Sequence, residues 1–196
     1  DNSLLYENVN GDSFVEVHEK LGIEWRIGHA TPCWGDFNND GLLDLYLATI
    51  YYEGIGTDNG TIHRSDLYMN KLTSFKLMNN YIDIPDRNDW TGIFADVNED
   101  GLLDLIAGGY GDYGKLSLYI NSGSENLENN WIKILLQGNG TSSNKNAIGA
   151  KITIDIDNGK VLKREVNAGF GSGNQAPFEQ HFGLGSIDSK VKATIT

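Results

Sequence analysis

One acidic phrase occurs twice in this chain and constrains its fold more than any other feature. The phrase reads DFNNDGLLDLYLA from Asp36 and DVNEDGLLDLIAG from Asp96. A shorter phrase follows each copy, LYMN ending at Asn70 and LYIN ending at Asn121. The shorter phrase also stands near the start of the sequence as LYEN, ending at Asn8, with no acidic phrase before it. Repetition over such a distance predicts an array of similar structural units.

Each unit is expected to contain a strand entering the acidic turn, a strand leaving it and a further strand carrying the LYxN phrase. The 24 glycines and the many asparagines favour short strands joined by tight turns. Because the first LYxN phrase lacks an acidic turn, we expect the sequence to open inside a repeat. The prediction is an all-β fold with two to three propeller-type blades, which are too few to close a propeller.

The two acidic phrases have the pattern of a cation-binding loop. Carboxyl or amide oxygens stand at positions 1, 3 and 5, glycine at position 6 permits a sharp bend, and an aspartate stands at position 9. The expected ligands, with the backbone carbonyl at the leucine of position 7, are Asp36, Asn38, Asp40, Leu42 and Asp44 in the first loop and Asp96, Asn98, Asp100, Leu102 and Asp104 in the second. These sets of oxygen ligands predict two Ca²⁺ sites, with calcium preferred over magnesium.

The residues of these loops also bear on two other interpretations. A solvated hairpin turn also uses Asp, Asn and Gly, although two copies in register favour the metal. An EF-hand is excluded because position 12 is Leu47 in one loop and Ala107 in the other, where glutamate is required.

With these motifs, residues 1 to about 123 resemble the FG-GAP or VCBS-type repeat found in calcium-loop β-propellers. The resemblance is carried by Trp34-Gly35-Asp36 through Leu45, by Phe94-Ala95-Asp96 through Leu105, and by the LYxN phrases. It implies a repeat domain over residues 1–125 in which calcium is structural and locks the turn between two strands of a blade. It also implies a secreted or cell-surface protein.

The repeat stops near residue 126, and a different β pattern follows. Strands are expected over residues 131–136, 150–156, 161–166 and 191–196, where β-branched and large apolar residues alternate between Gly and Asn clusters. The prediction is a small β-sandwich or partial barrel over residues 126–196. This segment resembles the ASPIC/UnbV domain of cartilage-acidic-protein-like proteins through IGAK at 148–151, Ala168-Gly169 and HFGLG at 181–185. The resemblance implies an architecture and no defined activity.

Charge and hydropathy exclude several classes of function. The formal net charge is -12, from 27 acidic and 15 basic residues, so the field of the chain repels phosphate backbones and nucleic acid is not an expected partner. Asp44 and Asp104 interrupt the most apolar stretches, so no membrane span is expected. Cys33 is the only cysteine, which excludes an internal disulfide and a thiolate zinc site, and we expect it to be a small buried residue.

No catalytic arrangement is evident, and no enzyme is predicted. The four histidines lack metalloprotease spacing, and no nucleophile elbow of the G-x-S-x-G type is present. His181 is expected to be a packing or turn residue. The glycines at 169, 171 and 173 lack the helix that a dinucleotide site needs. Exposed tyrosines could stack on sugars but are more often packing residues; the candidates are Tyr51, Tyr52, Tyr110 and Tyr113.

The sequence therefore predicts a non-enzymatic, calcium-stabilised extracellular structural or adhesion module. Open strand edges would pair with other copies of the chain or with a neighbouring protein, and repeated pairing would give a filament. The alternative is a ligand- or carbohydrate-binding fragment of a larger propeller protein, with an enzyme as the third hypothesis. Asn59 and Asn139 begin glycosylation sequons and make glycans a further expected partner.

Overall fold

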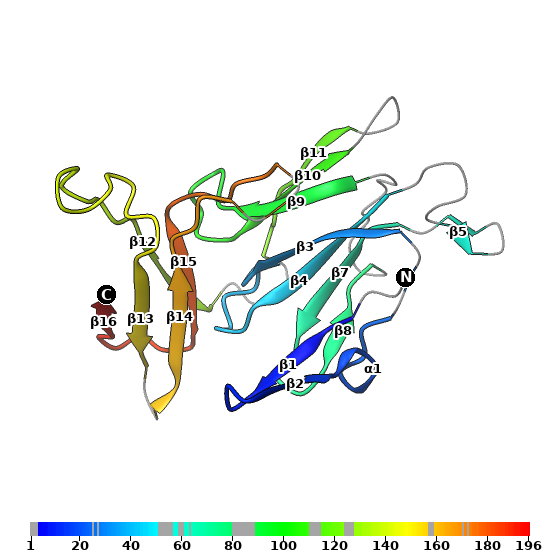
Figure 1. Cartoon of the computed structure of the whole chain (residues 1–196), viewed down its shortest axis with the longest axis horizontal. Coiled ribbons are helices and arrows are strands. Elements are labelled where there is room, and N and C mark those ends of the chain that lie inside the picture. The colour runs from blue at the N-terminus through cyan, green and yellow to red at the C-terminus, as the bar shows by residue number, and fades with distance from the viewer. Residues whose placement is uncertain are drawn as a thin grey trace. The chain divides into compact units, whose positions relative to one another are not determined.

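A computed structural model places short antiparallel strands and one short helix along the chain (Figure 1). The residues it describes are 4–24, 26, 28–50, 57–58, 61–62, 64–79, 89–109, 115–123, 128–156, 159–169, 171 and 173–196. The prediction of an all-β fold is confirmed, with several small sheets. No helix in these ranges is long and apolar enough to cross a membrane.

The chain divides into two compact units, and the division does not follow the order of the sequence. The first unit comprises Asp1–Trp34, Asp44–Gly92 and Ile106–Leu118. The second comprises Gly35–Leu43, Ile93–Leu105 and Tyr119–Thr196. Both acidic turns therefore belong to the same compact unit as the C-terminal segment. The loops of the repeats and the C-terminal strands have to be considered together.

The first repeat forms a four-stranded antiparallel sheet, called here the first repeat sheet. Its strands are β3 (His29–Gly35), β4 (Asp44–Thr49), β7 (Asp66–Asn70) and β8 (Phe75–Leu77), in the order β3-β4-β7-β8 (Figure 1). Every residue of β4 is buried, so both faces of this strand are covered. This burial explains why the LYLA stretch is continuously apolar instead of alternating.

The second repeat gives a three-stranded sheet, the second repeat sheet. It contains β9 (Asp89–Ala95), β10 (Asp104–Gly109) and β11 (Leu116–Tyr119), in the order β11-β10-β9. A small two-stranded ribbon of β5 (Thr57–Asp58) and β6 (Thr61–Ile62) precedes β7 in the sequence.

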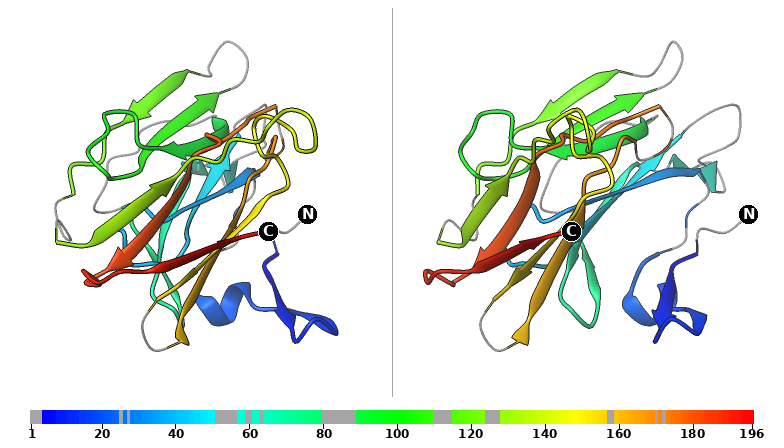
Figure 2. Two further views of the ribbon diagram at one scale, coloured as in Figure 1. Left: turned by 90° about the vertical axis from the view of Figure 1, so that its left-hand side faces the viewer. Right: turned by 60° about the vertical axis from the view of Figure 1, so that its left-hand side comes forward.

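A hairpin and the helix open the described chain. Strand β1 (Tyr6–Val9) pairs with β2 (Ser13–Glu16), and helix α1 (His18–Leu21) follows directly, as the blue segment in Figure 2 shows. The helix ends at Gly22, whose φ of 78° lies in the left-handed region that glycine adopts readily.

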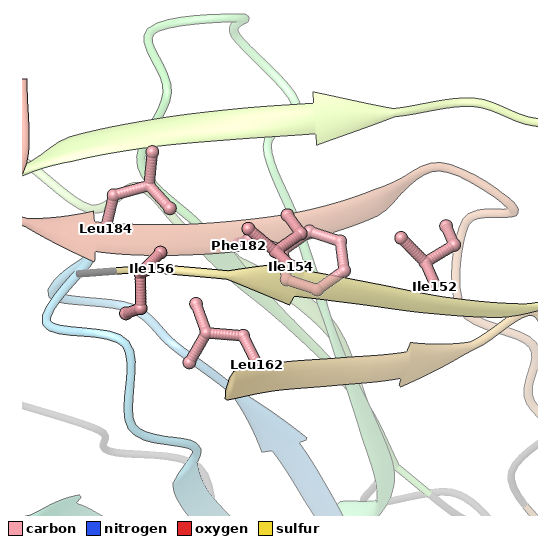
Figure 3. Packing of buried hydrophobic residues seen from close by; sticks show 6 residues of the cluster. All are labelled: Ile152, Ile154, Ile156, Leu162, Phe182 and Leu184. Carbon is pink, nitrogen blue, oxygen red and sulfur yellow. The ribbon is translucent and has the colours of Figure 1, made fainter. Parts of the chain in front are cut away.

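The C-terminal segment forms two further small sheets. Strand β12 (Asn130–Ile134) pairs with β15 (Gln180–Gly185), while β13 (Lys151–Asp155) lies between β14 (Val161–Glu165) and β16 (Lys192–Ile195). One hydrophobic core joins β13, β14 and β15 (Figure 3). Its buried members are Ile152, Ile154, Ile156, Leu162, Phe182 and Leu184. Four of the five strands lie where the apolar alternation predicts them, and β15 was not predicted because glycines interrupt its pattern.

Candidate functional site

The first acidic turn curls tightly around the carboxylate of its first residue. Asp40 N donates to Asp36 Oδ1 at 3.0 Å, and Gly41 N donates to Asp36 Oδ2 at 2.9 Å. This curl needs two residues with positive φ, and Asn39 (58°) and Gly41 (83°) supply them. Asparagine and glycine are the residues that adopt this conformation at the lowest cost, so the local sequence dictates the turn.

The second acidic turn repeats the same geometry. Asp100 N and Gly101 N donate to the two carboxylate oxygens of Asp96, at 3.1 and 2.9 Å. Glu99 and Gly101 have φ of 61° and 89°, close to the 58° and 83° of Asn39 and Gly41 in the first turn. The internal repeat in the sequence is therefore also a repeat of backbone conformation.

Oxygens at positions 1 and 3 lie against the same backbone N–H inside each turn. In the first turn the N–H of Asp40 is shared by Asp36 Oδ1 and Asn38 Oδ1, which brings these two oxygens side by side. The Asn38 amide then donates to Asp40 Oδ2 at 3.0 Å. The second turn has the same set of bonds among Asp96, Asn98 and Asp100. Side-chain oxygens gathered in this way have the chemistry of ligands for a hard divalent cation.

These side-chain oxygens accept hydrogen bonds from N–H groups of the chain. Within the described ranges, no group of three or more His, Cys, Asp or Glu side chains is arranged so that it could hold a metal ion. In each turn the carboxylates of positions 1 and 5 accept hydrogen bonds from backbone and amide N–H groups. The assignment of the ten predicted ligands therefore stays a prediction.

The aspartate at position 9 connects each turn to the third strand of its repeat. Asp104 is fully buried and accepts Val97 N at 2.9 Å and Asn121 N at 2.8 Å. In the first repeat, Asp44 Oδ1 accepts Asn70 N at 2.8 Å. The two acceptors receive the N–H of the asparagines that end the LYMN and LYIN phrases. This bond explains why the acidic turn and the LYxN phrase recur together, a link that sequence reasoning missed.

Strand β15 lies directly against the first turn. Gly183 N donates to Asp36 Oδ2 at 3.1 Å, and Gly185 N donates to Asn39 O at 2.8 Å. A Cβ atom on Gly183 would overlap Asp36 Oδ2 and the Asn39 backbone, so only glycine permits this approach. The Asn39 side chain bonds to His181 Nε2 at 2.7 Å. The HFGLG phrase therefore serves to dock the C-terminal segment on the first turn.

Burial under β15 changes the ionisation of the groups around the first turn. Burial, reinforced by the negative charge of Asp40, raises the pKa of Asp36 to about 6, although N–H donors and Arg164 oppose the shift. Burial also lowers the pKa of His181 to about 4. Arg164, which stacks on Phe182 at 5.1 Å, has its pKa lowered by burial in the same place. Burial and a neighbouring negative charge both disfavour the ionised form of a carboxylate, so the folded state makes Asp36 harder to ionise.

The second turn is more open and has a lysine as its counter-ion. Lys133 Nζ lies 3.1 Å from Asp96 Oδ2, and the bond raises the pKa of Lys133. Trp131 positions this lysine, since Nζ lies 5.5 Å from the centre of the indole ring. The indole fills the space that a Cβ on Gly101 would need and stacks on His181 at 5.9 Å. Sequence reasoning missed Lys133, because nothing in a single sequence pairs it with Asp96.

The remaining candidates contribute little to a site. Asn139 accepts the N–H groups of Thr141 and Ser142, and its Nδ2 donates to Ser142 at 2.8 Å, so the sequon amide is engaged in its own turn. Asn59, His63 and the four tyrosines named above lie outside the described residues.

His18 bonds to Glu16, and His29 lies 3.5 Å from Asp66. Cys33 is buried as expected, and burial raises the pKa of its thiol to about 11.

Comparisons with known proteins support the C-terminal interpretation. Residues 140–196 match the family described as ASPIC and UnbV. A curated relative, cartilage acidic protein 1 of Xenopus tropicalis, is 27% identical over 158 residues, which are 79% of this chain and 23% of that protein. The predicted ASPIC/UnbV resemblance is thus confirmed, while the FG-GAP/VCBS resemblance of the repeats stays a prediction.

Proposed function

We propose that this chain is a non-enzymatic, calcium-stabilised structural or adhesion module of the extracellular space. In this proposal the two repeat sheets are FG-GAP/VCBS-type blades of an incomplete propeller, and the C-terminal segment is a small β-sandwich that reinforces their acidic turns. The observation that carries the proposal is the matching hydrogen-bond pattern of the two turns, in each of which the oxygens of positions 1 and 3 lie against the same N–H.

The electrostatics of the first turn support a role for calcium. Asp36 is 1% exposed, and its neighbour Asp40 raises its pKa further, so the folded state bears the cost of a buried, crowded carboxylate. A bound Ca²⁺ supplies two positive charges to such a cluster and links both strands of the turn. In the second turn, Lys133 supplies part of this charge from within the chain. Stabilisation by calcium would then be linked to docking of β12 and β15.

Assembly is the second part of the proposal. Strand β11 is an edge strand in the described chain, and unpaired edges are sites at which further strands add. The similarity to a protein named for cartilage and for acidity agrees with an extracellular structural role and with the formal net charge of -12. Other copies of the chain or neighbouring proteins are the proposed partners, with glycans as a further class.

Thermal unfolding with and without calcium tests the proposal. We expect Ca²⁺ to raise the melting temperature, EGTA to reverse the change and Mg²⁺ to have a much smaller effect. Asp40→Ala and Asp100→Ala should each remove most of the calcium-dependent stabilisation of their own loop, because each loses the position-5 carboxylate. Asp188→Ala, in an exposed turn, is the matched control. Melting curves that are indifferent to both calcium and EGTA would refute the calcium part of the proposal.

A further inference from the structure

The two acidic turns differ in the charge of the donor that reaches them from the C-terminal segment. In each turn the second oxygen of the position-1 carboxylate accepts the N–H of the position-6 glycine and one further donor from outside the turn. For Asp36 this donor is the neutral backbone N–H of Gly183 at 3.1 Å, and for Asp96 it is the ammonium of Lys133, also at 3.1 Å. One turn is therefore closed by an amide and the other by a cation.

The pairing of β12 with β15 sets the positions of both donors. Trp131 is the register partner of Gly183, and Lys133 is the register partner of His181. Trp131 and Lys133 stand two residues apart on β12 and so lie on the same face of this two-stranded sheet. The same small sheet thus serves both turns, and the lysine is brought to Asp96 by its place in the strand.

The ammonium of Lys133 lies in an enclosed position. The Lys133 side chain is 19% exposed and the Asp96 side chain 2% exposed, so the pair is largely shielded from water. Nζ lies 5.5 Å from the centre of the Trp131 ring, and the indole lies against Gly101 of the same turn. Removing one partner of such a pair leaves the other charge without compensation, which costs more than the loss of a surface charge. Lys133 is thus a substantial part of the charge balance of the second turn.

A divalent cation in the second turn would need the carboxylate that Lys133 already holds. Asp96 is the position-1 residue of the predicted ligand set, and its two oxygens accept the N–H groups of Asp100 and Gly101 as well as the ammonium. A positive charge fixed on this carboxylate repels a second cation brought to the same group. Glu179 Oε1, 3.6 Å from Lys133 Nζ, offers the ammonium another acceptor when it leaves Asp96.

We propose that Lys133 is a built-in cation of the second turn, which stabilises the turn without metal and lowers its affinity for Ca²⁺. The lysine then regulates the turn as a competitor tethered to the neighbouring strand. In the first turn the matching donor on Asp36 is uncharged, and Lys160 Nζ bonds to the backbone carbonyl of Asp40 at 3.4 Å. Direct competition for a carboxylate oxygen therefore concerns the second turn. This inference rests on the proposed calcium role and adds the residue that regulates it.

Isothermal titration with calcium chloride tests the proposal in chains that keep one predicted site. The two turns are in contact, since Asn39 Nδ2 donates to Gly101 O at 2.9 Å, so their sites have to be separated by mutation. In the Asp40→Ala chain only the second turn retains its position-5 carboxylate. Adding Lys133→Met to this chain should raise its calcium affinity about tenfold or more, because the competing charge is removed. Methionine keeps an apolar chain against Trp131.

Three further chains are the controls. In the Asp40→Ala background, Lys133→Arg keeps the charge and should keep the low affinity. In the same background, Lys190→Met removes an equal charge from an exposed position before β16 and should leave the affinity unchanged. In the Asp100→Ala chain, which keeps only the first site, Lys133→Met should change the affinity much less than it does in the second turn.

Thermal unfolding separates this role from that of an ordinary ion pair. In EGTA, Lys133→Met should lower the melting temperature of the parent chain, because Asp96 is left without its counter-ion. Saturating calcium should remove most of that loss, since the metal then supplies the missing charge. An ion pair that serves only the packing of β12 would leave the variant equally destabilised with and without calcium. Circular dichroism establishes that each variant is folded.

Equal calcium affinities of the second turn before and after Lys133→Met would overturn the proposal, as would a similar gain in the Lys190→Met control. If the Asp100→Ala chain bound no calcium, the calcium role of the first turn would fail separately. Calcium binding to the second turn only after Lys133→Met would support the inference even then, because the lysine would have replaced the metal. No binding to the second turn in either chain would overturn the inference, whatever the first turn does.

Discussion

At the scale of single residues, the position-9 aspartates have a structural role that does not depend on a metal. Asp104 is completely buried and receives one backbone N–H on each carboxylate oxygen, from Val97 and Asn121. Each of these donors would be left without its partner if the carboxylate were removed. A buried unpaired N–H costs about 1–3 kcal/mol.

We predict that Asp104→Ala lowers the free energy of unfolding by about 2–4 kcal/mol in the presence of EGTA, from the loss of two buried acceptors. Asp104→Asn keeps one acceptor oxygen and should be affected less. Urea denaturation of both variants measures the difference, with Asp188→Ala as the exposed control. If Asp104→Ala were harmless without calcium but abolished stabilisation by calcium, the residue would be a metal ligand only.

We predict that the free energy of unfolding depends on pH through His181. Its pKa is about 4 in the folded chain, because burial disfavours the charged imidazole, whereas an unfolded histidine titrates near 6.5. The unfolded state therefore binds the proton first, and stability is lost as the pH falls from about 6.5 towards 4. The loss should amount to about 1–3 kcal/mol for this partly buried side chain.

Comparison with His181→Gln isolates this effect, since the titrations of the carboxylates are common to both chains. Between pH 7 and pH 4 the parent chain should lose more stability than the variant, as measured by urea denaturation at each pH. Parallel pH profiles for the two chains would show that His181 accepts a proton in the folded state as readily as in the unfolded state.

At the scale of elements, docking of β15 on the first turn depends on a glycine. Gly183 N donates to Asp36 Oδ2, and a Cβ at this position would overlap both that oxygen and the Asn39 backbone. We predict that Gly183→Ala destabilises the chain by about 2–4 kcal/mol through this overlap. The control is Gly169→Ala, where the nearest atom, Asn174 O, would lie 3.5 Å from the new Cβ. Equal stabilities of the two variants in urea denaturation would mean that β15 does not dock as described.

The sequence predicted the elements whose signals are local. The acidic turns follow from the residues that tolerate positive φ, at Asn39 and Gly41 for example, and the strands follow from apolar alternation. What it could not predict are contacts between segments far apart in the chain. Strand β15 has two glycines where a strand pattern needs side chains, because those glycines lie against the first turn. The pairing of Lys133 with Asp96 leaves no local pattern either.

At the scale of the whole molecule, the charge of -12 acts on stability in two separable ways. The negative charges of the chain repel one another, and any salt screens this repulsion. The stabilisation that screening gives therefore depends on ionic strength alone. Coordination by converging oxygens depends on the identity of the cation. Sodium chloride and calcium chloride at equal ionic strength therefore distinguish general screening from specific binding.

We predict that sodium chloride raises the melting temperature modestly and that calcium chloride at the same ionic strength raises it much further. The excess due to calcium should saturate with concentration, as binding to a limited number of sites requires. In a chain with both Asp40→Ala and Asp100→Ala, the calcium curve should fall to the sodium curve, because only screening remains. The opposite result is that the two salts raise the melting temperature of the parent chain equally. The acidic turns would then be stabilised by their own backbone N–H donors and by Lys133 and Arg164, with no metal in either turn.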